Sequence, residues 1–350
     1  MRLVLSLALA GVFLMAIPPA WGRPAADRTG TFTALSYNVA GLPEPLSGSE
    51  PGTNSPIISP LLNDYDLVLL QEDWVDVLAQ HGARPAGTDG VPRTGYHDLV
   101  VGAATHPYRS EPMSSPPPAT STAHRLPTGP TLTGDGLNHL SNFALAGLHR
   151  EMWDVCHGEV HVTAVETIAD ELGIDDPTGD DIDGGSADCG AQKGFSVTTI
   201  ELAEGVTVDL YNLHADAGGH RNDIAARGAN FAELTDFIQR HSRGRPVILG
   251  GDTNLRTGPG ARDDETWNDF LTAATLTDVC TVVDCGADAG EIDKFAFRSG
   301  GAVKLMPLSH VFEREKFTRD DGERLSDHDP LAVRFHWVAA HDDPPLVAPP

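Results

Sequence analysis

Short apolar runs that end in polar side chains recur along the chain and predict the strands of a sheet. Residues 31–39 alternate apolar and polar positions up to Asn38, and the continuous apolar run 67–70 is typical of a strand buried on both faces. Residues 195–202 and 206–214 flank an Ala-Glu-Gly turn and predict a hairpin. The polar residues that close these runs would meet at one edge of a sheet, where open sheets hold their ligands.

Helical periodicity is clearest in residues 224–241, which predict a long amphipathic helix. A short helix is predicted at residues 56–63, and further strands are predicted at 135–146, 292–297 and 331–337. The apolar face of the long helix would pack on a sheet and comprises Ile224, Phe231, Leu234, Phe237 and Ile238.

A glycine pair follows the short apolar run 247–249, which predicts a buried strand. Gly250 and Gly251 would turn the end of this strand, because glycine adopts backbone conformations that other residues avoid. The turn would let Asp252 and Asn254 project together into a cleft.

Two segments are too rich in glycine, proline and polar residues to predict regular structure. Residues 82–136 would form a long loop in which only 99–102 are ordered. Residues 175–190 are acidic and rich in glycine, but they lack the bidentate glutamate and the ligand spacing of a calcium loop. We interpret this second segment as a solvated loop.

The N-terminal apolar segment is typical of a secretory signal peptide. A basic residue precedes the apolar run 3–17, and small residues after it offer a cleavage site. The run is shorter than a membrane span. We therefore predict a secreted protein with a signal peptide over residues 1–26, a single domain over 30–338 and a disordered Pro-rich tail over 339–350.

The composition is that of a folded, acidic protein. Hydrophobic residues make up 40% of the 350 residues and charged residues 21%, which excludes a largely disordered or fibrous chain. The net charge is −26, from 50 acidic and 24 basic residues, and the bases form no cluster. Nucleic acid is a less favoured partner, because proteins that bind it usually carry a basic stripe. Metal ions can supply local positive charge, so a nuclease stays open.

Four cysteines fit an oxidising compartment and allow three pairings. We predict that Cys280 pairs with Cys285, which would staple a short loop. Cys156 would then pair with Cys189 and clip the acidic loop. A zinc site is less favoured, because neither pair has the short spacing of a zinc knuckle.

Six polar clusters follow one another in a distinctive order. Their carboxylate and amide oxygens are ligands that suit Mg²⁺, and their two histidines can supply a base and an acid. This combination predicts metal-assisted cleavage of a phosphoester. The clusters are Tyr37-Asn38, Gln71-Glu72, Asn212-Leu213-His214, Gly251-Asp252-Thr253-Asn254, Ile292-Asp293 and Ser326-Asp327-His328.

The order and spacing of these clusters resemble the endonuclease/exonuclease/phosphatase superfamily, the DNase I-like proteins, over most of the predicted domain. The resemblance implies an α/β fold, a four-layer α/β/β/α sandwich in which two mixed β-sheets pack face to face with helices outside. It also implies a metal-dependent phosphoric ester hydrolase that uses Mg²⁺, with Mn²⁺ and Ca²⁺ as alternative ions.

The same resemblance implies roles for individual residues. Glu72 would be the principal metal ligand, with Asn38 and Asp327 near the metal directly or through water. His328 would take a proton from the attacking water, and Asp293 would orient and stabilise the imidazolium that results.

Three further residues would handle the phosphoryl group. Asp252 and Asn254 would position the water and bind a phosphoryl oxygen, and His214 would stabilise the phosphorane-like transition state or protonate the leaving oxygen. Candidate substrate contacts on neighbouring loops are Trp74, Asp216, His220 and Arg221.

Segments between the motifs resemble the bacterial neutral sphingomyelinase branch, namely Lys193-Gly194-Phe195, residues 212–217 and residues 325–330. This resemblance implies a phospholipid substrate that loses its phospho-headgroup by in-line attack of water. We expect a monomer that makes transient contact with a membrane surface. An extracellular nuclease is the alternative, and an inositol phosphate phosphatase or a catalytically silent binding module comes third.

Overall fold

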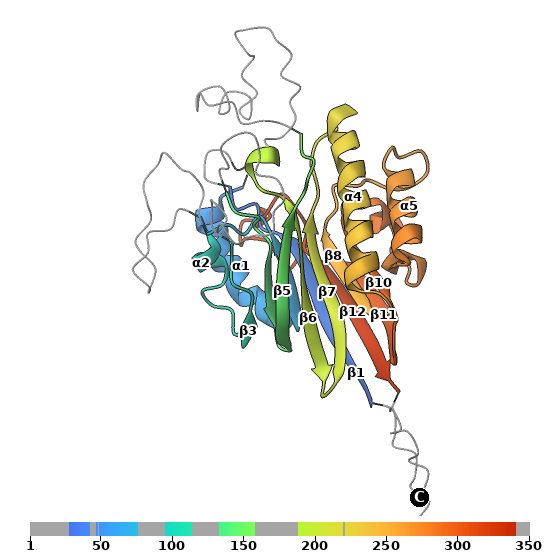
Figure 1. Ribbon diagram of the computed structural model, residues 1–350. Helices are drawn as coiled ribbons and strands as arrows, with labels where there is room; N and C mark the ends of the chain where they lie inside the picture. The colour runs from blue at the N-terminus through green and yellow to red at the C-terminus, as the bar shows by residue number, and fades with distance from the viewer. Residues whose placement is uncertain are drawn as a thin grey trace, which may run out of the picture.

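Figure 1 presents the computed structural model of the chain, which describes residues 28–42, 47, 49–75, 95–113, 133–157, 188–219 and 221–340. The predicted signal peptide and residues 341–350 of the predicted tail lie outside the described residues, and so do much of the two predicted loops and the candidate contact His220. Within the described residues, no helix has both the length and the apolar character needed to span a membrane.

The strands form two six-stranded sheets, with the order β11-β12-β1-β2-β4-β3 in the first and β5-β6-β7-β8-β10-β9 in the second. The first sheet consists of β1 (Arg28–Asn38), β2 (Leu67–Gln71), β3 (Tyr108–Arg109), β4 (Asn138–Ser141), β11 (Val303–Phe312) and β12 (Leu331–Ala339). The second consists of β5 (Ala144–Met152), β6 (Gly194–Ala203), β7 (Val206–His214), β8 (Val247–Asp252), β9 (Thr277–Asp278) and β10 (Asp293–Arg298).

Helices cover the outer faces of the two sheets (Figure 1). The first sheet packs against α1 (Pro51–Leu61) and α2 (His97–Val100), and the second packs against α4 (Arg221–His241) and α5 (Asp264–Ala274). Short 3-10 helices complete the described elements: η1 (Leu62–Asp64), η2 (Asp188–Gly190), η3 (Val279–Thr281) and η4 (Gly286–Gly290).

The two sheets pack face to face around an apolar core. Phe32 and Leu69 of the first sheet lie in one buried cluster with Ile248 and Phe295 of the second. Two further clusters join each sheet to its helices, and both sheets contain parallel and antiparallel pairs. The predicted α/β fold, a four-layer sandwich of two mixed sheets, is confirmed.

Strand direction brings the polar clusters to one end of the sandwich. β1 and β2 are parallel, and Asn38 pairs with Gln71 where they end. β7 and β8 are also parallel, and His214 pairs with Asp252 at their ends. β10 runs antiparallel to β8 and begins with Asp293 opposite Asp252. Both sheets therefore supply the clusters, rather than the single sheet edge that we predicted.

A buried polar bridge ties the two sheets together at this end. Gln71 Nε2 of β2 donates to Asn212 Oδ1 of β7 at 2.7 Å. Asn212 Nδ2 in turn donates to the backbone oxygens of Leu70 at 2.8 Å and Asn138 at 3.2 Å. Gln71 and Asn212 are both fully buried. Because buried amides are costly unless hydrogen-bonded, this bridge restricts how the two sheets can sit against each other.

Residues 135–146 were predicted as one strand but form parts of two. β4 ends at Ser141 in the first sheet, and β5 begins at Ala144 in the second. The Ser141 hydroxyl lies 2.8 Å from the backbone nitrogen of Phe143 and 2.7 Å from its oxygen, which closes a tight turn between the sheets. Apolar content continues through this crossing, so the sequence pattern hides it.

Other elements differ from the pattern in their limits or were missed. The predicted helix at residues 56–63 is α1, which begins earlier because Pro51 occupies its first turn, where a missing N–H is harmless. α5, β9 and β11 were not predicted. Pro307 interrupts the pattern of β11, and proline is tolerated there because β11 is an edge strand.

The glycine pair lies within β8 rather than in a turn after it, contrary to the prediction. A Cβ atom on Gly250 would lie 2.5 Å from Phe295 Cε1, and one on Gly251 would lie 2.2 Å from the backbone oxygen of Leu213. Gly251 also has a φ of 152°. The close approach of the neighbouring strands β10 and β7 therefore requires these glycines.

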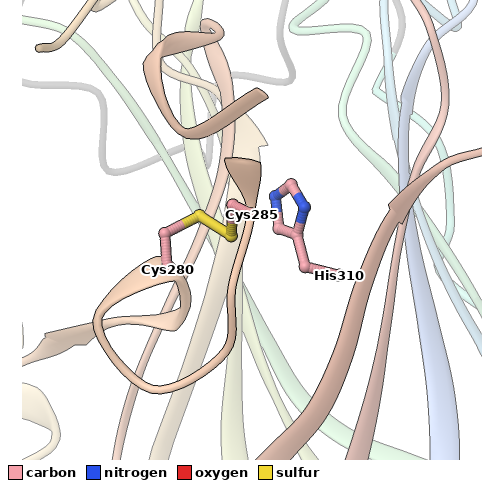
Figure 2. A group of neighbouring side chains, drawn as sticks. All are labelled: Cys280, Cys285 and His310. Carbon is pink, nitrogen blue, oxygen red and sulfur yellow. A yellow bond between two sulfur atoms is a disulfide. The ribbon is translucent and has the colours of Figure 1, made fainter. Parts of the chain in front are cut away.

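Both predicted disulfides are present. Cys156 and Cys189 join the segment after β5 to η2, and Cys280 and Cys285 join η3 to the residue before η4. Figure 2 shows the imidazole of His310 beside the second bridge. All four cysteines are in bridges, so neither pair forms the zinc site that was the less favoured interpretation.

Two glycine substitutions should have opposite effects on stability. We expect Gly251→Ala to lower the free energy of unfolding by about 1–3 kcal/mol, because the added methyl group meets backbone atoms of β7. Gly228→Ala in α4 meets no atom within 4 Å and should raise it by about 1 kcal/mol through helix propensity. Urea denaturation of both variants measures the changes, and equal effects would contradict the close-approach argument.

Candidate active site

Seven of the eight predicted site residues are linked by contacts at the end of the sandwich where the polar clusters meet. They come from the ends of three strands, the start of a fourth and the loops beside them. The linked residues are Asn38, Glu72, His214, Asp252, Asn254, Asp293 and His328.

The carboxylate of Asp252 is the centre of this arrangement. Its Oδ2 accepts a hydrogen bond from Asn38 Nδ2 at 3.2 Å and lies 3.3 Å from His214 Nε2 and 3.6 Å from His328 Nε2. Its Oδ1 accepts from the backbone N–H of Asn254 at 3.0 Å. Asp252 is 1% exposed, so protein groups rather than bulk water solvate its charge.

Nearby positive charges keep Asp252 ionised. Burial alone would raise the pKa of this carboxyl, but His328, His214 and Lys193 together hold the pKa below its ordinary value. A carboxylate that stays charged in a buried site can orient the two imidazoles on either side of it.

His328 is bound on its other ring nitrogen by Asp293. The distance from His328 Nδ1 to Asp293 Oδ2 is 2.7 Å, so Nδ1 carries the proton and Nε2 faces Asp252. Burial lowers the pKa of His328, and the carboxylates of Asp293 and Asp252 more than reverse this, so that the pKa lies well above its ordinary value. Asp293 belongs to the second sheet, whereas His328 precedes β12 of the first.

One ligand atom from each of Asp252, Asp293 and His328 lies within 4.8 Å of the other two, close enough for a shared metal ion. Both ring nitrogens of His328 already face carboxylates, however. The imidazole of His328 thus bridges the carboxylates of Asp252 and Asp293. These three residues share no member with the metal set predicted from the sequence, which consists of Asn38, Glu72 and Asp327.

Glu72 follows β2 in a left-handed backbone conformation, with a φ of 54°, which is uncommon for a residue other than glycine. Its Oε1 accepts from Asn38 Nδ2 at 2.8 Å and lies 3.9 Å from His214 Nε2. The side chain is 19% exposed. Glu72 thus reaches the centre of the site while its carboxylate stays open to an ion from solvent.

Asn38 faces the site with its NH₂ group. Its Oδ1 accepts from the backbone N–H of Ala40 at 3.0 Å, so Nδ2 is the atom that donates to Glu72 and Asp252. Asn38 orients both carboxylates in this arrangement. Of the two predicted roles, direct ligand or contact through water, the geometry favours the indirect one.

Two predicted residues lie further from the centre. Asp327 is exposed, and in the described part of the chain its carboxylate is hydrogen-bonded only by Ser326 Oγ, at 3.3 Å. Asn254 has a φ of 50°, and its Nδ2 donates to the backbone oxygen of Ala215 at 3.1 Å. The side chain of Asn254 therefore holds the loop after β7, while its backbone N–H contacts Asp252.

Lys193 is a charged group beside the site to which the sequence analysis assigned no role. Its ammonium group is buried and ion-paired with Asp188. Burial lowers the pKa of Lys193, but the charges of Asp188, Glu72 and Asp252 raise it above the ordinary value, so the group stays charged. The segment that contains Lys193 carried part of the family resemblance, but a lysine before a strand gives no sign of its burial or of its ion pair.

Two of the candidate substrate contacts are buried. Trp74 and Asp216 are 2% and 1% exposed, so neither side chain offers a surface to a substrate. Arg221 is exposed at the first position of α4. Burial is a tertiary property, and the position of these residues near motifs did not reveal it.

Comparison with known proteins shows what the chain resembles in sequence and in fold. No protein-family model matches it. A sphingomyelinase of Mycobacterium tuberculosis (strain ATCC 25618 / H37Rv) is 30% identical over 326 residues, which are 89% of this chain and 54% of that protein. This chain therefore spans about half the length of the curated relative that it matches.

Two solved structures resemble the chain in fold at low sequence identity. A variant of beta toxin from Staphylococcus aureus with bound magnesium ions has a TM-score of 0.53 and 14% identity, and the match covers 87% of this chain and 99% of that one. An endonuclease/exonuclease/phosphatase from Beutenbergia cavernae DSM 12333 has a TM-score of 0.51 and 13% identity, with 87% and 71% covered.

The chain has the DNase I-like fold, which it shares with the endonuclease/exonuclease/phosphatase from Beutenbergia cavernae. In sequence it resembles the mycobacterial sphingomyelinase. The resemblance predicted from the sequence, to this superfamily and to its sphingomyelinase branch, is confirmed.

The pKa of His328 should depend on its partner carboxylate. In protein kept free of divalent metal, we expect Asp293→Asn to lower the pKa of His328, because an anion that favours the imidazolium is removed. NMR titration of the His328 ring protons measures this pKa. The matched change Asp327→Asn, at an exposed carboxylate, should have a smaller effect, and the reverse order would contradict the assigned pair.

Proposed function

We propose that this protein is a secreted, divalent-metal-dependent phosphodiesterase that hydrolyses a phospholipid, in the manner of a sphingomyelinase or phospholipase C. The observation that carries the proposal is the buried carboxylate of Asp252 between two imidazoles, with His214 and His328 both within 3.6 Å. Glu72 lies beside them with its carboxylate open to solvent. Imidazoles and carboxylates in this arrangement suit hydrolysis of a phosphoester.

The donor chemistry of the site fits a magnesium-type ion. Glu72 supplies a carboxylate, Asn38 orients it, and Asp327 lies next to His328 with an exposed carboxylate. Hard oxygen donors and room for water suit Mg²⁺, which keeps part of its hydration shell in proteins. When bound, such an ion would neutralise charge on the phosphoryl oxygens. The beta toxin variant that shares the fold contains bound magnesium, which supports the same class of ion.

His328 and Asp293 would carry the proton-transfer chemistry. In the neutral form of His328, in which Nδ1 alone carries a proton, Nε2 takes the proton of the attacking water, and Asp293 holds Nδ1 and stabilises the imidazolium that forms. On the opposite side of Asp252, His214 Nε2 faces the same space and is suited to the phosphoryl or leaving oxygen. Asp252 and the backbone N–H of Asn254 position these groups, and the proposal keeps both residues in the catalytic set.

A lipid headgroup is the substrate class that the sequence relative and the net charge favour. The mycobacterial relative, a sphingomyelinase, aligns with 89% of this chain. The net charge of −26 opposes association with a polyanion such as DNA more than association with a lipid headgroup that carries a cationic choline. The N-terminal apolar segment and the two disulfides support action outside the cytoplasm.

A substrate panel tests the reaction and its metal dependence together. We expect release of phosphocholine from sphingomyelin vesicles with Mg²⁺, and loss of that release with a chelator. Nicking of plasmid DNA without lipid hydrolysis would instead support the extracellular nuclease. Release of inorganic phosphate from inositol polyphosphates would support the phosphatase. Failure on every phosphoester would leave the catalytically silent binding module.

His328→Ala should lower kcat by roughly 10²–10⁴-fold, because a general base contributes about that much to such a reaction. The matched control is His336→Ala, at a half-buried histidine on β12 outside the site, which should leave kcat near the wild-type value. Steady-state hydrolysis at saturating metal measures both. Equal activity of the two variants would remove His328 from the mechanism.

A further inference from the structure

The backbone at Glu72 needs external support. Its φ of 54° lies in a region that side chains other than glycine rarely adopt, so the surrounding structure must hold it there. The chain after β1 already packs closely against this point, because a Cβ atom on Gly41 would lie 2.2 Å from the backbone oxygen of Glu72. The conformation of Glu72 is therefore imposed by its neighbours.

The next residue, Asp73, is bound by groups from two other elements. Its side chain is fully buried, and its Oδ2 lies 2.7 Å from His97 Nδ1 and 2.9 Å from Asn138 Nδ2. Its backbone is bound as well: the N–H donates to the oxygen of Gly136 at 3.0 Å, and the carbonyl accepts from Asn138 Nδ2 at 2.8 Å. Asp73 is thus restrained through its main chain and its carboxylate.

The partners of Asp73 come from separate parts of the first sheet's layer. His97 begins α2, and its backbone N–H donates to the oxygen of Trp74 at 3.2 Å. Asn138 begins β4 and follows Gly136, whose positive φ of 65° and close contact with Trp74 bring that segment against the chain after β2. The loop that carries Glu72 is therefore clamped between a helix and a strand.

A buried carboxylate at this point is costly unless its donors are in place, and an apolar side chain would avoid that cost. Hydrogen bonds from His97 and Asn138 are directional, whereas apolar packing is not. They can therefore fix the backbone orientation at Glu72. Buried groups behind a ligand typically orient it in this way.

We propose that Asp73, His97 and Asn138 form a positioning network that holds Glu72 in its metal-binding orientation. The network rests on the proposed function, since it assumes that Glu72 binds a divalent ion. Its members act through the backbone of Glu72, and they are positioning residues rather than catalytic ones.

Metal binding tests the network without any substrate. Electron paramagnetic resonance of Mn²⁺ titrated into metal-free protein measures the dissociation constant, and we expect Asp73→Asn and His97→Leu to raise it roughly 10- to 100-fold. His97→Gln keeps a side-chain donor and should recover part of the affinity. Hydrolysis by these variants should return towards the wild-type kcat at high metal concentration.

A matched control separates positioning from general stability. Asp209 is also buried in a strand and hydrogen-bonded, to Thr199 and Ser242, but it lies at the end of β7 away from His214. Asp209→Asn should lower the thermal midpoint without changing the Mn²⁺ dissociation constant. Either variant, Asp73→Asn or His97→Leu, would overturn the network if it folds and binds Mn²⁺ with wild-type affinity. If Asp73→Asn does not fold, the measurement on His97→Leu alone decides the question.

The same measurements distinguish the two proposals. Wild-type protein that binds Mn²⁺ through Glu72, more weakly after Asp73→Asn, but cleaves no phosphodiester would overturn the proposed function and keep the network. The reverse case is active protein whose metal affinity falls after Glu72→Gln but not after Asp73→Asn or His97→Leu. That result would overturn the network and keep the proposed function.

Discussion

The burial of one carboxylate, that of Asp252, is the constraint on which the rest of the site depends. A charge that is 1% exposed must find its solvation in the protein, and it does so from Asn38, His214 and His328. These three partners come from three different strands or the loops before them. The two sheets must therefore meet with their ends aligned before Asp252 can remain charged.

The alignment has its own support in the Gln71–Asn212 hydrogen bond. Both residues belong to motifs that the sequence analysis associated with chemistry, yet each acts here as a structural tie between sheets. The neighbouring residues Glu72 and His214 reach the site from the two ends of this tie. In each of these two motifs, one residue joins the sheets and another, Glu72 or His214, contacts the site.

Strand ends and residue chemistry made much of this site predictable. Asn38, Glu72, His214, Asp252 and Asp293 each adjoin a strand with a clear apolar pattern, and a two-residue motif gives both the position and the type of donor. Features that depend on distant packing were not predictable.

The crossing between β4 and β5 has no break in apolar content. The glycines of β8 are required because Phe295 and Leu213 leave no room for a Cβ atom. Likewise, the burial of Trp74 and the influence of Glu72 and Asp252 on Lys193 depend on residues far apart in the sequence. Local patterns therefore identified the donors at the site but missed the groups that support them.

The pairing of Asp293 with His328 joins a strand of the second sheet to the loop before a strand of the first. Neither sheet with its helices contains both members of this pair. On the proposed mechanism, the base and the carboxylate that orients it therefore come together only when the two sheets pack against each other. A small separation of the sheets would break the pair while the secondary structure remained intact.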